Sequence, residues 1–171
     1  MKINFFSLIS ALVILFAAPA FAGPQFIDDS GYAVSGYDVV SYWKLKQSEV
    51  GKPQASPLLG KKDITADYNG VKWAFSSAEN RDEFLKDPAK YAPQFDGHCA
   101  YGVAKGGKVQ ANPNLWRIVD GKLYLNITKN VVGFWEEDIP GNISKAGKNW
   151  PGLQKSSSPN KNAPGFTPKE L

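Results

Sequence analysis

The sequence predicts a small α+β domain made of two β-hairpins with short covering helices. Two turns carry this prediction, because Asn69-Gly70 and Asp120-Gly121 each separate two short strand-like runs. Asn-Gly and Asp-Gly are the dipeptides that two-residue hairpin turns favour. Apolar residues at helical spacing follow both hairpins. We expect the hairpins to share one sheet, and no internal repeat is evident beyond them.

Helices are predicted before and after the first hairpin. Asp38 is placed to cap a short helix over residues 39–45. After the hairpin, Ser76 and Glu79 fit a capping box, so Ser76 is the predicted N-cap of a helix that ends before Pro88. We interpret Asn80 as an ordinary surface residue of that helix. Residues 46–60 are polar, contain Gly and Pro, and are predicted to form a loop.

The second half of the chain is predicted to be more irregular. Residues 94–112 are rich in glycine and show no periodicity. After the second hairpin, Thr128 is the predicted cap of a helix through Asp138. A last short helix is expected to end near Trp150.

The N-terminus has the three parts of a secretory signal peptide. Met1-Lys2 is a short positive segment, residues 5–18 are apolar and uncharged, and Ala20-Phe21-Ala22 is a signal-peptidase pattern. The apolar run is shorter than the ~20 residues that span a bilayer. We therefore expect cleavage after Ala22 and a periplasmic or secreted protein with no membrane span after cleavage.

Length and composition then divide the chain into three parts. Residues 1–22 are the predicted signal peptide, and residues 23–151 are of a size that folds as one domain. Residues 152–171 lack apolar periodicity and are predicted to be a disordered tail. The formal net charge of the 171-residue chain is only +4, with Lys and Arg scattered, so nucleic acid is not an expected partner.

The middle of the chain resembles the YHS domain family, over roughly Gly36 to Trp150. The resemblance rests on the segments GYDVVSYW, NGVKWAFSSAENRDEFLKDPAKYAPQF, CAYGVA, WRIVDGKLYLN and FWEEDIPGNI. It is closest to the exported single-domain branch of the family. The family implies metal binding, with a pattern close to Phe-Cys-Ser-x-x-Cys after the hairpin. Here Ser76 and Asn80 stand at the two cysteine positions, and neither side chain suits a soft metal.

The pair His98-Cys99 is where a soft-metal site remains conceivable. Each occurs as the sole residue of its type in the chain, so a closed four-ligand zinc site lacks ligands. Cu(I) accepts fewer ligands, and copper is therefore the metal or cofactor that the resemblance favours at Cys99 and His98. Adjacent residues of an extended segment point to opposite sides, which argues against joint coordination. The alternative is a buried structural Cys99, and a reactive thiol is a third reading.

Two functions stay open on this basis, and neither is enzymatic. The first is an exported YHS-like binding module that binds metal, most plausibly copper. The second is a metal-free domain for protein interaction or scaffolding. No catalytic residues are assigned, because the single histidine leaves the serines without a base and no nucleophile-elbow motif surrounds them. The cluster Glu136-Glu137-Asp138 is interpreted as a solvated helix face. The five tryptophans are expected in the core.

Overall fold

A computed structural model describes residues 25–157 and 162–171 of the chain. The predicted signal peptide, residues 1–22, and the expected mature N-terminus at Gly23 lie outside the described residues. No helix in the described ranges is long and apolar enough to cross a membrane.

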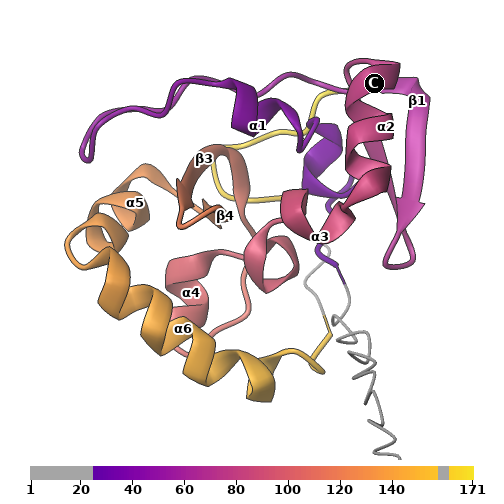
Figure 1. The fold of residues 1–171 in the computed structure, drawn as a ribbon. Coiled ribbons are helices and arrows are strands. Elements are labelled where there is room, and N and C mark those ends of the chain that lie inside the picture. The colour runs from indigo at the N-terminus through magenta and orange to yellow at the C-terminus, as the bar shows by residue number, and fades with distance from the viewer. Residues whose placement is uncertain (1–24, 158–161) are drawn as a thin grey trace, which may run out of the picture.

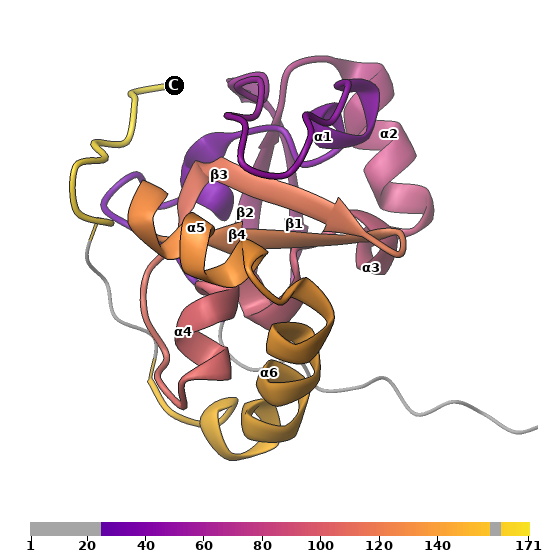
Figure 2. The ribbon, with the colours of Figure 1, turned by 90° about the vertical axis from the view of Figure 1, so that its left-hand side faces the viewer.

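The fold is α+β, as predicted, with helices packed around two separate hairpins (Figures 1 and 2). The first elements are η1 (Val34–Gly36), α1 (Ser41–Lys44), β1 (Lys61–Tyr68), β2 (Val71–Phe75), α2 (Ala78–Lys86) and α3 (Pro88–Tyr91). They are followed by η2 (Gln94–Gly97), α4 (Ala100–Ala104), β3 (Asn112–Val119), β4 (Lys122–Asn126), α5 (Lys129–Glu136) and α6 (Ile139–Leu153). Each hairpin is its own two-stranded antiparallel sheet, so the expectation of one shared sheet is wrong.

The two halves of the domain have the same plan. We call residues 34–91 the first unit and residues 95–142 the second unit. In each unit a strand of 8 residues, a two-residue turn and a strand of 5 residues precede a helix. The second hairpin lies 51 positions after the first throughout, and its irregularity between Asn112 and Trp116 matches that between Lys61 and Thr65. The repeat therefore extends beyond the hairpins.

Helix caps repeat at the same spacing. Ser77 caps α2 by accepting a hydrogen bond from the backbone N–H of Asn80, and Thr128 caps α5 through Val131 in the same way. Asp87 and Asp138 then cap α3 and α6, each with a proline in the first turn. These oxygens satisfy backbone donors that the first turn of a helix leaves unpaired.

The buried aromatic residues also correspond. In the first unit Trp73 packs on Phe84 with ring centroids 5.2 Å apart, and in the second Tyr124 packs on Trp135 at 5.9 Å. The main core joins the two hairpins through Phe75, Leu123 and other buried residues. Smaller clusters bury the faces of α4, α5 and α6 against β4 and one another.

Entry into each unit is by a strained turn. Val34 and Ser35 have φ of 51° and 54°, and Phe95 and Asp96 have φ of 56° and 51°. Such positive values are unfavourable for side chains with a branched or bulky Cβ. A glycine with positive φ follows in both cases, and a buried residue then starts α1 or α4. Asp38 and Cys99 are thereby placed at equivalent points.

Several helix boundaries differ from the predictions. Ser77, one residue after the predicted Ser76, caps α2. The segment over residues 94–112 contains η2 and α4 instead of being wholly irregular. The helix after Thr128 ends at Glu136, since Asp138 starts α6 by capping it. The last helix is 15 residues long and ends at Leu153.

The C-terminal segment contacts the domain where the structure describes it, and the disordered tail over residues 152–171 stays a prediction. Residues 152 and 153 belong to α6. Ala163 is buried, and the ring of Phe166 lies 6.4 Å from that of Tyr37. Asn162 hydrogen-bonds the carboxylate of Asp29 at 3.0 Å. Two apolar side chains thus pack on the domain, although the segment has no regular periodicity.

Candidate functional site

A buried polar cluster around Asp38 ties α1 to the start of α2. Asp38 is fully buried, with 0% exposure. Its Oδ1 accepts from the backbone N–H of Val40 at 2.9 Å. Its Oδ2 accepts from the backbone N–H of Ser76 at 2.9 Å, from Ser76 Oγ at 2.6 Å and from Asn80 Nδ2 at 2.6 Å. Four donors thus stabilise a carboxylate that is removed from water.

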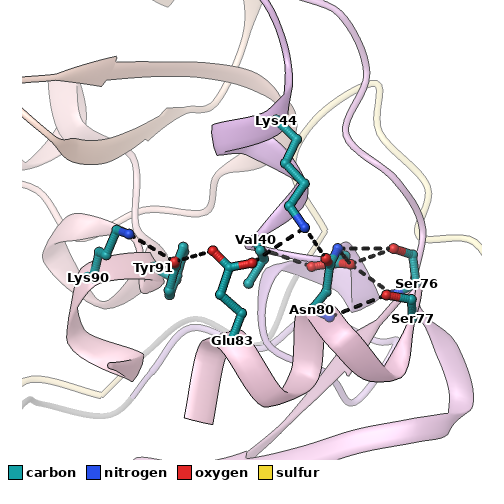
Figure 3. Close-up of polar contacts among 9 residues, drawn as sticks. Val40, Lys44, Ser76, Ser77, Asn80, Glu83, Lys90 and Tyr91 are labelled. Atoms are coloured by element: carbon teal, nitrogen blue, oxygen red, sulfur yellow. Dashed lines mark hydrogen bonds and ion pairs between the residues drawn. The ribbon is translucent and has the colours of Figure 1, made fainter. Parts of the chain in front are cut away.

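Charged residues extend this cluster to the surface (Figure 3). Lys44 Nζ donates to Asn80 Oδ1 at 2.5 Å and forms an ion pair with Glu83 at 3.4 Å. Tyr91 donates its hydroxyl proton to Glu83 at 2.6 Å, and Lys90 donates to the same Tyr91 oxygen at 2.9 Å. The hydrogen bond from Tyr91, with smaller help from Lys44, lowers the pKa of Glu83.

Ser76 and Asn80 occupy the positions at which the family resemblance implies metal-binding cysteines. Both side chains point into the Asp38 cluster, where the Ser76 hydroxyl and the Asn80 amide donate to the carboxylate. Hydroxyl and amide oxygens are poor ligands for a soft metal. A copper ion does not fit this donor set, because binding would also require these groups to give up their bonds to Asp38.

The structure corrects three sequence interpretations at this point. Ser76 donates hydrogen bonds to the Asp38 carboxylate and does not cap α2. Asn80 is only 5% exposed and is therefore not an ordinary surface residue. Asp38 was expected to act as a cap for residues 39–45, whereas it is the central acceptor of the cluster. The signal for this role is a carboxylate directly before the apolar pair Val39-Val40, but its partners lie 38 and 42 residues away.

Cys99 is the counterpart of Asp38 in the second unit. It is 0% exposed, in agreement with a buried structural cysteine. Its thiol donates to Asn126 Oδ1 at 3.5 Å, and its sulfur accepts from the backbone N–H of Gly102 at 3.3 Å. Burial raises the pKa of the thiol, while backbone hydrogen bonds from Gly102, Ile127 and Tyr101 oppose that rise. The balance favours the protonated, unreactive form at neutral pH.

His98 is equally buried but faces other partners. Its Nδ1 lies 2.8 Å from the carbonyl oxygen of Phe95. The ring lies between Phe26 and Trp150, with centroid distances of 5.4 and 6.0 Å. Burial lowers the pKa of His98 to about 4, and Lys108 contributes in the same direction, against the hydrogen bond to Phe95. The imidazole is therefore neutral at physiological pH.

The two candidate metal ligands thus have separate environments. Cys99 faces Asn126 and the first turn of α4, whereas His98 faces an aromatic enclosure. Both residues have extended backbone angles, which direct neighbouring side chains apart. In residues 25–157 and 162–171, no three His, Cys, Asp or Glu side chains form a group that could hold a metal ion. Metal coordination by Cys99 and His98 stays a prediction.

The carboxylate run at the end of α5 behaves differently from its sequence interpretation. Glu136 is buried, with a side chain 7% exposed, and forms an ion pair with Arg117 at 2.6 Å. Asp138 caps α6, and Glu137 is exposed. Glu137 and Asp138 are both exposed and fit the expected solvated face, whereas Glu136 does not. The pairing of Glu136 was missed because its partner lies on β3 and nothing in the local spacing connects the two.

Comparisons with known proteins agree with the resemblance found in the sequence. The family model described as YHS domain matches residues 56–95, which span the first hairpin, α2 and α3. No curated protein and no solved structure matches the chain. The matched segment contains Ser76 and Asn80, and YHS domains are generally associated with metal handling. Residues 56–95 of this chain match the YHS domain model, and the two positions at which the resemblance implies cysteines hold residues of a hydrogen-bonded carboxylate cluster.

Proposed function

We propose that this protein is an exported, non-enzymatic binding module that folds and acts without a bound metal ion. The observation that carries the proposal is the saturated Asp38 cluster. Ser76 Oγ donates to the buried carboxylate, and Asn80 Nδ2 donates both to the carboxylate and to Ser76 Oγ. In this arrangement hydrogen bonds hold α1 to α2. In the family, this is the part of the domain where the resemblance implies metal coordination by two cysteines.

Two further features support a role in binding instead of catalysis. The chain has one histidine, and its ring is fully buried in the aromatic enclosure. A general base must come within hydrogen-bond reach of a substrate proton. The single thiol is also buried and protonated, which removes its nucleophilic form. Export is supported by the signal-peptide pattern of residues 1–22.

Metal analysis of protein purified from the exported fraction tests the proposal. Mature wild type and Cys99→Ser are each exposed to Cu(I) under anaerobic conditions, passed through a desalting column and analysed for copper. We expect substoichiometric copper in both proteins and an unchanged melting temperature with or without a chelator. One equivalent of copper in wild type that is absent from Cys99→Ser would overturn the proposal. That result would support the copper-binding function implied by the resemblance.

A further inference from the structure

The loop between α1 and β1 is the main difference between the two units. Twenty positions separate Asp38 from Leu58, whose carbonyl accepts the Asp38 N–H, and ten separate Cys99 from its equivalent acceptor Val109. We call residues 46–56 the long loop. It reaches from the first unit to β3 and α5 of the second, as its path in Figure 1 shows.

Hydrogen bonds from β3 hold the long loop in a defined conformation. Arg117 donates to the carbonyl oxygens of Ser48 at 3.1 Å and Glu49 at 3.2 Å. Trp116 donates its indole N–H to the carbonyl oxygen of Ala55 at 2.8 Å. Ile118 donates its backbone N–H to Gln47 Oε1 at 2.6 Å. The loop is therefore preorganised, which reduces the entropy lost when a ligand binds against it.

A buried ion pair fixes the same loop to α5. Arg117 binds Glu136 Oε1 through Nε at 3.0 Å and through a terminal nitrogen at 2.6 Å. The two side chains are only 6% and 7% exposed. The other oxygen of Glu136 accepts the backbone N–H of Gly51 at 2.8 Å. The negative charge of Glu136 is thus already compensated on the loop side of α5.

A pocket of about 390 Å³ lies between the long loop, β3 and one face of α5. Its volume is within the usual range of small-molecule sites, ~300–1,000 Å³. The wall is mainly apolar, with Leu115 and Trp116 from β3 and Val132 and Gly133 from α5. A Cβ added at Gly133 would meet no atom within 4 Å. The pocket is therefore open at the position where a larger residue would narrow it.

The lining contains an unsatisfied hydrogen-bond donor. Gln54 Oε1 accepts the backbone N–H of Ser48 at 2.9 Å, which assigns the amide orientation. Gln54 Nε2 is buried and has no hydrogen-bond partner in the described part of the chain. A buried donor without a partner is destabilising. Because this nitrogen is not exposed to solvent, an acceptor atom of a ligand would satisfy it after the Gln54 side chain turns toward the pocket.

The charged groups of the pocket favour an anion. Lys52 and Lys129 line it from opposite elements, the long loop and α5. Neither lysine forms an ion pair in residues 25–157 and 162–171. Glu136 is the acidic residue among the lining residues, and Arg117 neutralises it. Two lysines and the buried Gln54 amide therefore border a mainly apolar space, which is complementary to a carboxylate on an apolar body.

We propose that this pocket binds a small organic carboxylate with a compact apolar body. The apolar part packs between Trp116 and Val132, and the carboxylate accepts from Gln54 Nε2 and pairs with Lys52 and Lys129. This inference rests on the proposed binding function, because it names the class of ligand that the module binds.

Calorimetric titration of the mature protein with 1-naphthaleneacetate, and with its neutral amide as the matched control, tests the ligand class. We expect the carboxylate to bind with 1:1 stoichiometry and about tenfold more tightly than the amide, since hydrogen bonds to charged groups are the stronger ones. Equal affinity for the two compounds would overturn the anionic part of the proposal. Absence of binding by both compounds at millimolar concentration would overturn the site itself.

Two variants locate the binding. Gly133→Leu fills the open side of the pocket, and Gly147→Leu is its control, because Gly147 lies in α6, away from the pocket, with no atom within 4 Å of an added Cβ. Both changes raise helix propensity, so both proteins should fold. We expect at least a tenfold loss of affinity in Gly133→Leu and none in Gly147→Leu. Equal affinity in the two variants would place binding elsewhere and overturn the assignment.

An added negative charge tests the polar end of the pocket. Gln54→Glu keeps the acceptor for Ser48 but replaces the free donor with a carboxylate oxygen, and we expect binding of 1-naphthaleneacetate to fall at least tenfold. Lys145→Gln, on the exposed face of α6, serves as a surface control with unchanged affinity. If these titrations fail, the pocket proposal is wrong, but the result of the copper analysis is unaffected. If copper binds through Cys99, the metal-free function is wrong, but the result of the pocket titrations is unaffected.

Discussion

The first and second units share a backbone plan but differ in what their buried centres contain. At the same point of the plan the first unit has a carboxylate with four donors, and the second has a neutral thiol with weak hydrogen bonds. A backbone that places N–H groups around one side chain accommodates either group. Two of the four donors to Asp38 are backbone N–H groups, and the other two are the side chains of Ser76 and Asn80. The difference teaches that the shared backbone supplies only part of the donor set, and that side chains of the first unit supply the donors that a buried carboxylate needs in addition.

The loops of the two units differ in a complementary way. The short connection of the second unit stays local, whereas the long loop of the first unit covers β3 and α5 of the second. The Asp38 cluster is saturated, but the pocket under the long loop retains an unpaired buried amide and two lysines. A saturated polar group stabilises the fold, and an unsatisfied one is available to a ligand.

Replacing the two buried centres should have the largest and most unequal effects. Asp38→Ala leaves four donors without their acceptor, and we expect a loss of about 3–5 kcal/mol in the free energy of unfolding. Cys99→Ala removes one sulfur atom and leaves a small cavity, at a cost of about 1–2 kcal/mol. Urea denaturation of both variants measures the difference.

Asp38→Asn sharpens this comparison because it preserves size and one acceptor oxygen. We expect a stability between those of wild type and Asp38→Ala. If the Asp38 and Cys99 variants were equally stable, the two centres would contribute alike, and the contrast between a charged and a neutral centre would be wrong.

The pH dependence of the free energy of unfolding should report the burial of His98 in the second unit. The folded state holds the pKa of His98 at about 4, whereas the unfolded value is about 6.5. Below pH 6.5 the unfolded chain therefore binds a proton that the folded protein rejects, so stability falls between pH 6.5 and 4. The contribution is about 3 kcal/mol across that window.

A His98→Phe variant provides the control for this titration. It should flatten the fall in unfolding free energy between pH 6.5 and 4, as measured by denaturation at a series of pH values. An unchanged pH profile in His98→Phe would mean that carboxylates of the native state account for the acid sensitivity.

Local chemistry made much of the fold predictable. Asn69-Gly70 and Asp120-Gly121 adopt the positive φ values that their turns require, so both hairpins were foreseen. The cap of α2 was misplaced by one residue because Ser76 and Ser77 carry the same hydroxyl. Only the position of Asp38, 38 residues before Ser76, decides which serine is free to cap the helix.

Non-local pairing explains what could not be predicted. The second unit repeats the first at a fixed spacing, but its residues differ, as where Trp73 corresponds to Tyr124 and Asp38 to Cys99. Arg117 and Glu136 lie 19 positions apart, and their pairing depends on how α5 packs beside β3. The pocket requires the long loop to cross between units. Burial of His98 and Cys99 is likewise a property of the assembled core.

The C-terminal segment should stabilise the first unit, with an effect of intermediate size. Phe166 packs on Tyr37, and a Cβ at Gly36 would lie 3.0 Å from Leu171 Cδ1. Phe166→Ala removes a half-buried ring, and we expect a loss of about 1–2 kcal/mol in unfolding free energy. Thermal denaturation beside the exposed control Thr167→Ala measures it. Equal melting temperatures would show that residues 162–171 are dispensable, as a disordered tail would be.

The smallest effects are expected at the repeated helix caps, where the two units should behave alike. Ser77→Ala and Thr128→Ala each remove the side-chain oxygen that accepts the third backbone N–H of its helix, from Asn80 at 3.2 Å and Val131 at 3.3 Å. We expect each change to cost about 1 kcal/mol. Because the two caps lie in different units and share no partner, the double variant should cost the sum of the two. A loss of stability in only one of the two single variants would show that the common backbone plan does not make the two caps equally stabilising. A double variant whose loss differs from the sum would show that the two caps are energetically coupled.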